Sequence, residues 1–495
     1  MTGLSAGAIV PTGLESDAAY QVIVSRDRRF DGRLWFGVTS TGIYCRPVCS
    51  AQTPRQSNVR FFAVPAAAVS AGFRACKRCR PDSAPGSRHW DHRQDLTAKA
   101  LRLIADGVVD ESGVAGLASA LHVSERHVHR TLIAEVGAGP LQLAQSRRAQ
   151  TARMLLEQTD MSIADIAFAS GFSSLRQFND VMKREFGAPP SHLRTSPRST
   201  LAAADPLLVL RLRFRPPYDA DHVGEFLAAR AISGLEVHSF TASGWAHRRM
   251  VRLPSRAAAV EVSVSDDHVL VRSDADLRDT SVLVRRVRKW LDLDADPESI
   301  NHVLERDRHL GPRVRSRPGI RVPTTVDPWE TLVRAIVGQQ VSVSGATTVL
   351  GRLTAATSSD SDSELVAFPT AADVAALGVD RIAALGMPGS RARTIANVAT
   401  AIAVGEVDLD QPDTESLGSQ LLAMRGIGPW TVSYLQMRGL GDPDAFPETD
   451  LILRQNAGRL GLPEQARELA QHAQKWSPWR AYAAHHIWSL PKEQR

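Results

Sequence analysis

Four cysteines are the residues whose type and spacing most directly indicate chemistry in this sequence. Cys45, Cys49, Cys76 and Cys79 are the only cysteines among 495 residues, and 26 residues separate the two close pairs. Four thiolates can surround a zinc ion tetrahedrally, and the short spacers let both pairs bind one ion. A thiolate is also the nucleophilic form of cysteine. The spacing therefore predicts one zinc site, and it leaves open whether the zinc is purely structural or also activates a sulfur.

A second candidate group lies in the stretch LLAMRGIGPWTVSYLQMRGLGDPDAFPETDLILRQ, residues 421–455. Gly426 and Gly428 allow a tight hairpin between two helices, whose exposed backbone N–H groups can hold a phosphate. Asp450 follows 22 residues after Gly428 and opens an apolar helix. Its carboxylate could stabilise a developing positive charge or activate a water molecule. The alternative is that Asp450 only caps the helix.

Length and composition place these residues in a multidomain protein. A chain of 495 residues, 43% of them hydrophobic, can form about three domains with separate cores. The N-terminus lacks the features of a signal peptide, and no run of 18 apolar residues is present, so we expect a cytoplasmic protein without membrane contact. Thiols stay reduced in that compartment, which favours metal binding over disulfides.

The charge is distributed unevenly along the chain. Residues 1–200 carry 25 Lys and Arg against 17 Asp and Glu, whereas residues 201–495 carry 34 against 36. The basic front part indicates attraction to nucleic-acid phosphates, although basic surfaces also serve solubility alone.

Two similar segments in the middle of the chain predict a repeated helical unit. Residues 117–140 and 166–190 share a layout, and their Gly–Pro endings, at 137/140 and 187/190, lie 50 residues apart. Each segment has a short turn followed by an amphipathic helix, with Val128 and Leu132, or Phe178 and Met182, facing inward. Two copies of a helix-turn-helix unit are the simplest interpretation. Residues 86–94 and 195–206 are expected to be linkers.

The C-terminal 290 residues predict a small sheet followed by helices. Alternating stretches at 259–264 and 268–273 indicate strands, which suggests a mixed α/β module. From about residue 290 the pattern is helical, and Leu332, Val333, Ile336 and Val337 fall on one face of a helix that begins near a proline.

The cysteine-bearing stretches TGIYCRPVC and AGFRACKRCRPD closely resemble the N-terminal domain of the Ada family, bacterial sensors and repairers of methylated DNA. The resemblance covers about residues 15–85 and implies that Cys45 accepts a methyl group from a DNA methylphosphotriester. Methylation of one sulfur would change the charge of the zinc site from −2 to −1 and weaken its repulsion of DNA phosphates. The basic residues expected to line that surface are Arg46, Arg74, Lys77, Arg78 and Arg80.

The repeated helical segments are similar to the AraC-type DNA-binding domain, and residues 163–194 carry the more diagnostic half. The resemblance implies two recognition helices in successive major grooves. The residues expected to face bases or phosphates are Arg126, His127, Arg130, Ser173, Arg176, Gln177 and Asn179. For each of them, a merely solvent-exposed side chain is the alternative.

The hairpin stretch, together with WSPWRAYAAHHIWS at 476–489, resembles the helix-hairpin-helix glycosylases and specifically the AlkA type, 3-methyladenine DNA glycosylase II, over about residues 205–490. The resemblance implies that the damaged nucleotide is flipped out and that Asp450 is the catalytic carboxylate. Aromatic faces hold cationic bases well, and the residues implied for the base-binding site are Trp430, Tyr434, Trp488 and Tyr218, with core packing as their alternative. His485 and His486 are expected to be surface or packing residues.

Two positions within this resemblance refine the expected activity. Gln340 occupies the place of the wedge that fills the gap left by the flipped nucleotide, where the family pattern has an apolar residue. Trp430 occupies the place where bifunctional relatives carry a lysine, so we expect base removal without strand cleavage. No organic cofactor and no metal is expected in this half, and the lack of cysteine after Cys79 excludes a second thiolate acceptor.

As a whole, the chain resembles an Ada–AlkA fusion and is expected to be multidomain and mainly α. We expect an α/β zinc domain at 1–85 and an all-α tandem helix-turn-helix domain at 95–195. A small α/β module at 205–290 and an all-α helix-hairpin-helix glycosylase domain at 291–495 complete the chain. The expected partners are double-stranded DNA with alkylated bases or methylphosphotriesters, promoter DNA and RNA polymerase. The alternatives are a transcription regulator with an inactive C-terminal half, and an active glycosylase whose front half is a DNA-targeting module with structural zinc.

Overall fold

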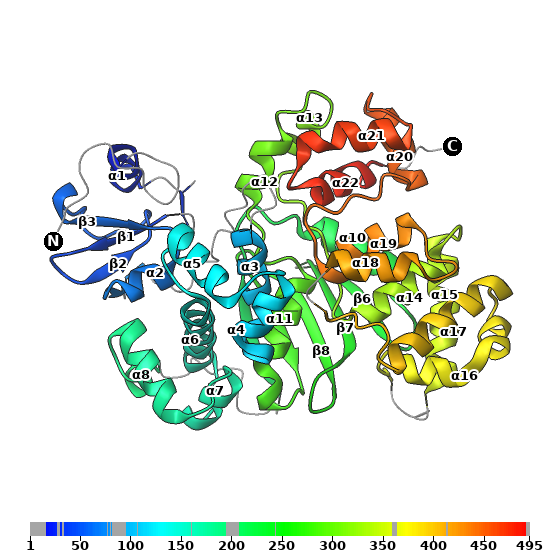
Figure 1. The fold of residues 1–495 in the computed structure, drawn as a ribbon, viewed down its shortest axis with the longest axis horizontal. Helices are drawn as coiled ribbons and strands as arrows, with labels where there is room; N and C mark the ends of the chain where they lie inside the picture. Colours follow the sequence, from blue (N-terminus) through cyan, green and yellow to red (C-terminus); the bar gives the residue numbers. More distant parts are fainter. Residues whose placement is uncertain are drawn as a thin grey trace. The chain divides into compact units, whose positions relative to one another are not determined.

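The computed structural model divides the chain into two compact units, residues 1–206 and 207–495, each of which is described by itself (Figure 1). The described residues are 16–26, 30–31, 34–76, 78–79, 81, 96–105, 107–159, 161–194, 207–242, 244–358, 364–411 and 414–491. The linkers expected at 86–94 and 195–206, and the side chains of Lys77 and Arg80, lie outside them.

The first unit begins with a small four-stranded sheet in the order β3-β1-β2-β4. Its elements are α1 (Ser16–Val24), β1 (Trp35–Val38), β2 (Ile43–Cys45), η2 (Gln56–Asn58), β3 (Val59–Phe62), α2 (Pro65–Ser70) and β4 (Arg74–Ala75). Strands β2 and β4 pair in parallel. Because Cys45 ends β2 and Cys76 directly follows β4, this pairing brings the two cysteine pairs together.

Seven helices follow in the first unit. They are α3 (Leu96–Ala105), α4 (Val108–Ala120), α5 (Glu125–Val136), α6 (Pro140–Gln158), α7 (Ile163–Ala169), α8 (Leu175–Phe186) and α9 (Pro190–Leu193). Helices α5 and α8 begin at equivalent caps, Ser124 and Ser174, whose side chains accept hydrogen bonds from backbone N–H groups. They end at Gly137 and Gly187, both with positive φ. The predicted repeat is therefore confirmed down to its helix caps, and the residues predicted to face inward are buried.

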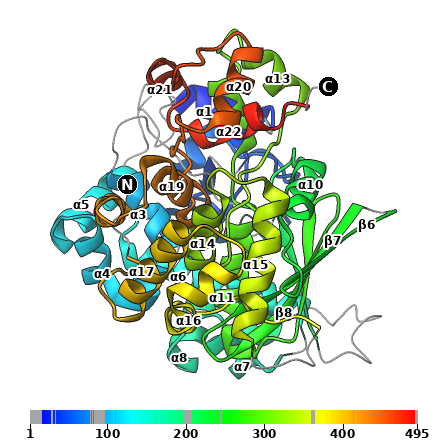
Figure 2. The ribbon, with the colours of Figure 1, turned by 90° about the vertical axis from the view of Figure 1, so that its right-hand side faces the viewer.

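The second unit contains a five-stranded antiparallel sheet in the order β5-β9-β8-β7-β6. Its strands are β5 (Leu208–Arg213), β6 (Glu236–Thr241), β7 (Gly244–Arg252), β8 (Ala257–Val264) and β9 (His268–Ser273), and its helices are α10 (Ala220–Arg230) and α11 (Thr280–Trp290). The predicted α/β module is confirmed, and both stretches predicted to be strands lie in the sheet. Figure 2 shows this sheet beside α10 and α15 (Val343–Thr357).

The remaining helices of the second unit include α14, which packs against α15, α17 and α19. They are α12 (Pro297–Leu304), α13 (Gly311–Ser316), α14 (Pro328–Gly338), α16 (Ala371–Ala384), α17 (Gly389–Ala403), α18 (Thr414–Leu422), α19 (Pro429–Leu435), α20 (Leu451–Arg459), α21 (Ala466–Ala473) and α22 (Arg480–Trp488), with short turns η3 (Leu277–Asp279), η4 (Gln436–Leu440) and η5 (Gln474–Trp476). Leu332 and Ile336 of α14 are fully buried with Ile395 of α17 and Leu421 of α18. As expected, α14 presents its apolar face to this core.

A buried ionic network connects the sheet of the second unit to α14. Arg249 on β7 donates to Glu236 on β6 and to Glu330 on α14, with N–O distances of 2.8 and 2.5 Å. Arg334 on α14 pairs with the same two carboxylates at 2.9 and 2.7 Å. Two cations thus balance two anions, and of the four side chains only that of Arg334 is partly exposed.

Across the described part of the chain, no helix is both long and apolar enough to cross a membrane.

Candidate functional sites

The four cysteines form one cluster in the first unit. Their sulfur atoms all lie within 4.8 Å of one another, and a tetrahedral zinc site with bonds of about 2.3 Å needs sulfurs about 3.8 Å apart. The thiol of Cys49, then that of Cys79, and burial raise the pKa of Cys45. A bound cation is what would make thiolates stable in so crowded a site. The donor set therefore fits zinc, and the backbone N–H of Arg46 adds a 3.5 Å hydrogen bond to Cys79 Sγ.

The basic residues near the cluster differ in their surroundings. Arg46 forms an ion pair with Asp31, so its charge is already balanced. Arg74 is exposed and lies against the end of α8, where a Cβ on Gly187 would be 2.8 Å from Arg74 Cδ. Arg78 is exposed. Arg46 is thus partly exposed near the cluster, but Asp31, an acidic neighbour distant in sequence, already pairs with it.

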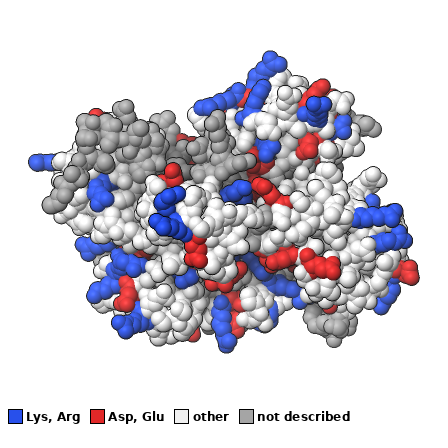
Figure 3. All heavy atoms as spheres, viewed as in Figure 1, with Lys and Arg blue, Asp and Glu red and all other residues white. Residues whose placement is uncertain are grey.

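The predicted recognition helices expose most of their predicted contact residues. Arg126 and Arg130 on α5, and Arg176 on α8, are exposed, whereas Gln177 is partly exposed and its side-chain oxygen accepts from Ser173 Oγ at 3.2 Å. Figure 3 shows basic side chains mixed with acidic ones on the face it draws.

The predicted hairpin in the second unit joins α18 to α19. Gly426 has φ +94°, and a Cβ there would lie 2.0 Å from Thr394 Oγ1, so only glycine fits. Gly428 has φ −112° and open space around it, and it is the N-cap of α19. The conformational freedom of glycine is thus required at the first position and not at the second.

Asp450 combines the two roles that the sequence left open. It caps α20, because its Oδ1 accepts from the backbone N–H of Leu453 at 2.7 Å. The same oxygen accepts from Trp488 Nε1 at 3.0 Å, and Oδ2 accepts from Trp430 Nε1 at 2.9 Å. The carboxylate is partly exposed. Three donors therefore fix its orientation while one side stays accessible to a ligand.

A series of aromatic and basic side chains in mutual contact extends from the indole rings of Trp430 and Trp488. Trp430 stacks on Tyr434 with centroids 5.2 Å apart, and His485 lies 5.5 Å from Trp488 and 6.0 Å from Phe226. The guanidinium carbons of Arg230 and Arg438 lie 3.8 and 3.9 Å from the Phe226 ring centroid. The contact ring, as we name it, comprises Asp450, Trp430, Tyr434, Arg438, Arg230, Phe226, His485 and Trp488.

Sequence reasoning missed Phe226, Arg230 and Arg438. The available signal was the i, i+4 spacing of an aromatic and an arginine, which occurs at 226/230 and again at 434/438. His485 and His486 are both buried, so packing, and not the surface, was the correct alternative. His485 Nδ1 lies 3.1 Å from His222 Nε2, and burial lowers the pKa of His222 to about 4.

Tyr218 and Gln340 are placed differently from the contact ring. Tyr218 stacks on Phe214 at 4.3 Å and its hydroxyl donates to the carbonyl of Leu291 at 3.2 Å. Gln340 is exposed in the turn between α14 and α15, with φ +55°, a strained conformation for a residue other than glycine. Its neighbour Gln339 donates through Nε2 to Gly426 O at 3.2 Å and to Thr431 Oγ1 at 2.9 Å.

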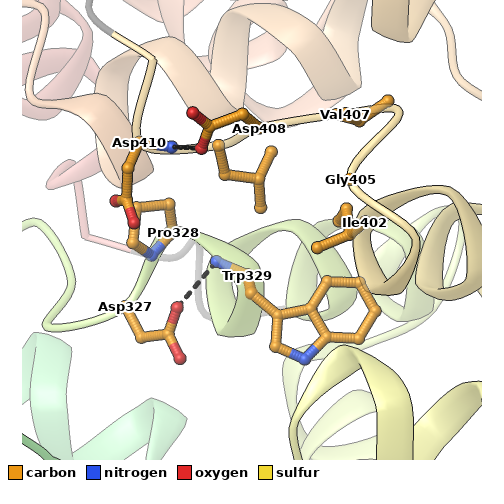
Figure 4. Close-up of a pocket in the computed structure, with 9 residues that line it drawn as sticks. Asp327, Pro328, Trp329, Ile402, Gly405, Val407, Asp408 and Asp410 are labelled. Carbon is orange, nitrogen blue, oxygen red and sulfur yellow. Dashed lines mark hydrogen bonds between the residues drawn. The ribbon is translucent and has the colours of Figure 1, made fainter. Parts of the chain in front are cut away.

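A separate pocket of about 390 Å³ lies at the beginning of α14 (Figure 4). Asp327, Asp408 and Asp410 contribute to its lining with Trp329 and Ile402, and it shares no residue with the contact ring. Burial, and then Glu330, raise the pKa of Asp327 to about 6. Asp327 also caps α14 by accepting from Trp329 N at 2.9 Å, which gives it a structural role.

Comparison with known proteins gives matches that cover both the cysteine cluster and the region of Asp450. Family models match the metal-binding domain of Ada at 18–82, a helix-turn-helix domain at 117–196, the AlkA N-terminal domain at 209–327 and the HhH-GPD superfamily base excision DNA repair proteins at 333–479. A probable bifunctional transcriptional activator/DNA repair enzyme AlkA of Mycobacterium tuberculosis (strain CDC 1551 / Oshkosh) is 44% identical over 483 residues, 96% of each chain. The chain belongs to the bifunctional Ada–AlkA family.

Further relatives match parts of this Ada–AlkA protein. The DNA-3-methyladenine glycosylase 2 of Escherichia coli (strain K12) is 33% identical over 282 residues, which cover 56% of this chain and 95% of that protein. The solved structure of a 3-methyladenine DNA glycosylase from Archaeoglobus fulgidus aligns with a TM-score of 0.50 and 20% identity, over 56% of this chain and 96% of the other, and shows the same fold.

Membership of the Ada–AlkA family confirms the resemblance drawn from the motifs. The multidomain, mainly α fold and the single zinc site are confirmed by the matched domains and the cysteine cluster. The chain thus combines an Ada-type zinc domain, a helix-turn-helix DNA-binding domain and a base-excision glycosylase domain. The roles of individual residues are a separate question.

Proposed function

We propose that the protein excises alkylated bases at Asp450, accepts methyl groups from DNA methylphosphotriesters at Cys45, and regulates transcription through its helix-turn-helix domain. The observation that carries the excision proposal is the carboxylate of Asp450, held by the indole N–H groups of Trp430 and Trp488 beside Tyr434. The substrates are duplexes with alkylated bases such as 3-methyladenine, whose nucleotide is flipped out of the helix.

Excision is a hydrolysis of the bond between C1′ and the base nitrogen. The bonding electron pair leaves with the base, and positive charge develops on the sugar, where the Asp450 carboxylate stabilises it. A water molecule adds to C1′ and gives up a proton, which leaves an abasic sugar. Trp430, Tyr434 and Trp488 hold the base through their ring faces, while Tyr218 and Gln340 remain a predicted base contact and a predicted wedge.

The reaction ends at the abasic site because no amine is positioned to attack the sugar from the hairpin helix. The sequence GIGPWTVSYLQMRG contains no lysine, and Trp430 donates to Asp450 from the position where a lysine would stand. We therefore propose a monofunctional glycosylase.

Methyl transfer at Cys45 is a displacement at carbon. The sulfur lone pair forms the new S–C bond, and the electron pair of the broken C–O bond stays on the phosphate, which becomes an anionic phosphodiester. A zinc ion held by the four cysteines would keep this sulfur in the thiolate form. Cys49, Cys76 and Cys79 complete its ligand set, and the Arg46 N–H donates to Cys79 Sγ.

DNA recognition is assigned to both units. Arg126 and Arg130 on α5, and Arg176 and Gln177 on α8, contact promoter DNA, and the backbone at Gly426 and Gly428 holds a phosphate near the damaged base. As an activator the protein contacts RNA polymerase, and it acts in the cytoplasm. We divide it into domains at 1–85, 95–195, 205–290 and 291–495.

The decisive experiment compares wild-type protein with Asp450→Asn on methylated duplex DNA and measures free methylated purines. Asparagine can still cap α20 but carries no charge, so we expect release by the wild type and a loss of at least about 10²-fold in the variant. Asp408→Asn, an exposed aspartate of the separate pocket, should leave release unchanged. No release by any protein would favour a regulator without excision activity, and equal release by all would assign the chemistry to another carboxylate.

A second experiment separates methyl acceptance from a purely structural zinc site. Incubation with radiolabelled methylphosphotriester DNA should place label on the peptide that contains Cys45. If this peptide stays unlabelled while the protein retains its zinc, the first unit would serve only to target the protein to DNA.

A further inference from the structure

Two arginines of the contact ring, Arg438, which is buried, and Arg230, which is half-buried, lie against the ring of Phe226. Arg438 is only 6% exposed, and its Nε has no hydrogen-bond partner within the described part of the chain. Burial, and secondarily the charges of Arg230 and Arg334, lower the pKa of Arg438 to about 9, against the opposing effect of Tyr434. Burial also lowers the pKa of Arg230, which a hydrogen bond with Tyr434 partly offsets. Because its pKa stays above 7, the guanidinium group of Arg438 remains charged near neutral pH.

These two cations differ from Arg249 and Arg334 in what surrounds them. Arg249 and Arg334 are balanced by Glu236 and Glu330. Among the described residues, no carboxylate lies within 4 Å of the guanidinium of Arg230 or Arg438. A buried charge without a counter-ion is unfavourable. This end of the contact ring thus carries two positive charges with no carboxylate close to them among the described residues.

The charge that develops on a leaving base depends on the lesion. When a neutral base departs, it takes the bonding pair and becomes negative before it gains a proton. When a base that is already cationic departs, it becomes neutral. A fixed positive charge beside the base therefore stabilises the transition state for neutral lesions and opposes the binding of cationic ones. Asp450, at the sugar end, favours both reactions.

We propose that Arg438, assisted by Arg230, is a specificity-determining residue that favours the release of neutral damaged bases relative to cationic ones. The inference rests on the excision function proposed above and adds a division of labour within the contact ring. Its carboxylate end stabilises the sugar cation, and its guanidinium end stabilises the electron pair on the base. The aromatic side chains Phe226 and Tyr434 lie between the two arginines and the indoles.

The test is single-turnover excision by the full-length protein on two duplexes. One carries 7-methylguanine, which is cationic in the nucleotide, and the other carries hypoxanthine, which is neutral. For Arg438→Met, the ratio of maximal rate to half-saturating protein concentration should fall at least about tenfold for hypoxanthine. The ratio for 7-methylguanine should stay the same or rise. Arg438→Lys keeps the charge and should recover most of the release of hypoxanthine.

A matched variant shows what a purely structural loss would produce. Arg313 donates to the carbonyl groups of His486 and Ser489 at the end of α22. Arg313→Met should loosen the helix that carries Trp488 and slow both substrates by a similar factor. Thermal unfolding of each variant reports whether it folds.

Three outcomes would overturn the inference: equal losses on both substrates in Arg438→Met, no recovery by lysine, or no hypoxanthine release by the wild type. If the wild type also released no 7-methylguanine, the proposed excision function would fail with it.

Discussion

Cys45 and Asp450, the two groups that we propose react, are both held in place by neighbours, but the two units achieve this differently. Cys45 is 5% exposed and its neighbours are three other sulfurs, so its ionisation depends on a bound cation. Asp450 is partly exposed, and two indoles from α19 and α22 hold it. A methylated sulfur is consumed, whereas a carboxylate that stabilises charge is unchanged after the reaction. The first site would therefore react once and stay modified, which suits a sensor of damage, whereas the second could act repeatedly as an enzyme.

Zinc removal should have the largest effect of these changes, and it should unfold part of the first unit while leaving the second unit intact. Structural zinc contributes about 10 kcal/mol or more to the folding of small domains, so chelation should unfold the region around the cysteine cluster. Hydrogen exchange of the full-length protein should show lost protection in β1–β4 and unchanged protection in α14 and α19. Base release should persist after chelation, and its parallel loss would contradict the independence of the two sites.

Replacing an indole by a phenyl ring should affect only the Asp450 site. Trp488→Phe keeps an aromatic face but removes one N–H donor to the carboxylate, a charge-assisted hydrogen bond of about 1.5–3 kcal/mol. Base release should fall roughly 10- to 100-fold, while methyl uptake by Cys45 is unchanged. Trp245→Phe removes an indole hydrogen bond to Ala220 O elsewhere in the unit. That control should lose stability without losing the maximal rate of release.

Acid should destabilise the second unit through its buried histidines. Burial lowers the pKa of His222 to about 4 and that of His486 to about 3, so the unfolded chain binds more protons below its ordinary pKa of about 6.5. The free energy of unfolding should therefore be constant above that pH and fall by about 1 kcal/mol per pH unit for each histidine as the pH decreases towards 4. Hydrogen exchange of α10 and α22 between pH 7 and 5 measures this fall.

Substitution of the histidines should identify the source of that acid sensitivity. His222→Gln should reduce the slope, whereas the exposed His302→Gln should leave it unchanged. An unchanged slope in His222→Gln would assign the effect to other groups.

The smallest effect is expected from single phosphate contacts of the first unit. Arg176→Ala and Arg130→Ala should each weaken promoter binding and reduce the dependence of log affinity on log salt concentration by about one. Equal changes would support two equivalent recognition helices. Arg184→Ala, on the same helix as Arg176 but hydrogen-bonded to Gln145, serves as the control. A salt dependence that no variant changes would show that these helices do not reach the DNA backbone.

The sequence predicted those features of both sites that depend on residues close together in the chain. The cysteine spacing predicted the zinc cluster, and the position of Asp450 before an apolar helix indicated that it could cap that helix. Phe226 and Arg230 belong to α10, at the other end of the second unit's sequence, and only tertiary packing brings them to Arg438. The pairing of Arg46 with Asp31 has the same origin. The positive φ of Gln340 has no sequence marker, since no glycine or asparagine stands at that position.

The hydrogen bonds of Gln339 have a further consequence. Its side chain joins the turn before α15 to Gly426 O and Thr431 Oγ1, and Arg391 donates to its carbonyl. The hairpin and the turn that carries Gln340 are therefore joined by direct hydrogen bonds. In a duplex bound at the hairpin, Gln340 would contact the strand at a constant distance from the phosphate that the hairpin holds. Successive nucleotides would then reach Gln340 as the protein moves along the DNA, without a change in the conformation of the hairpin or of this turn.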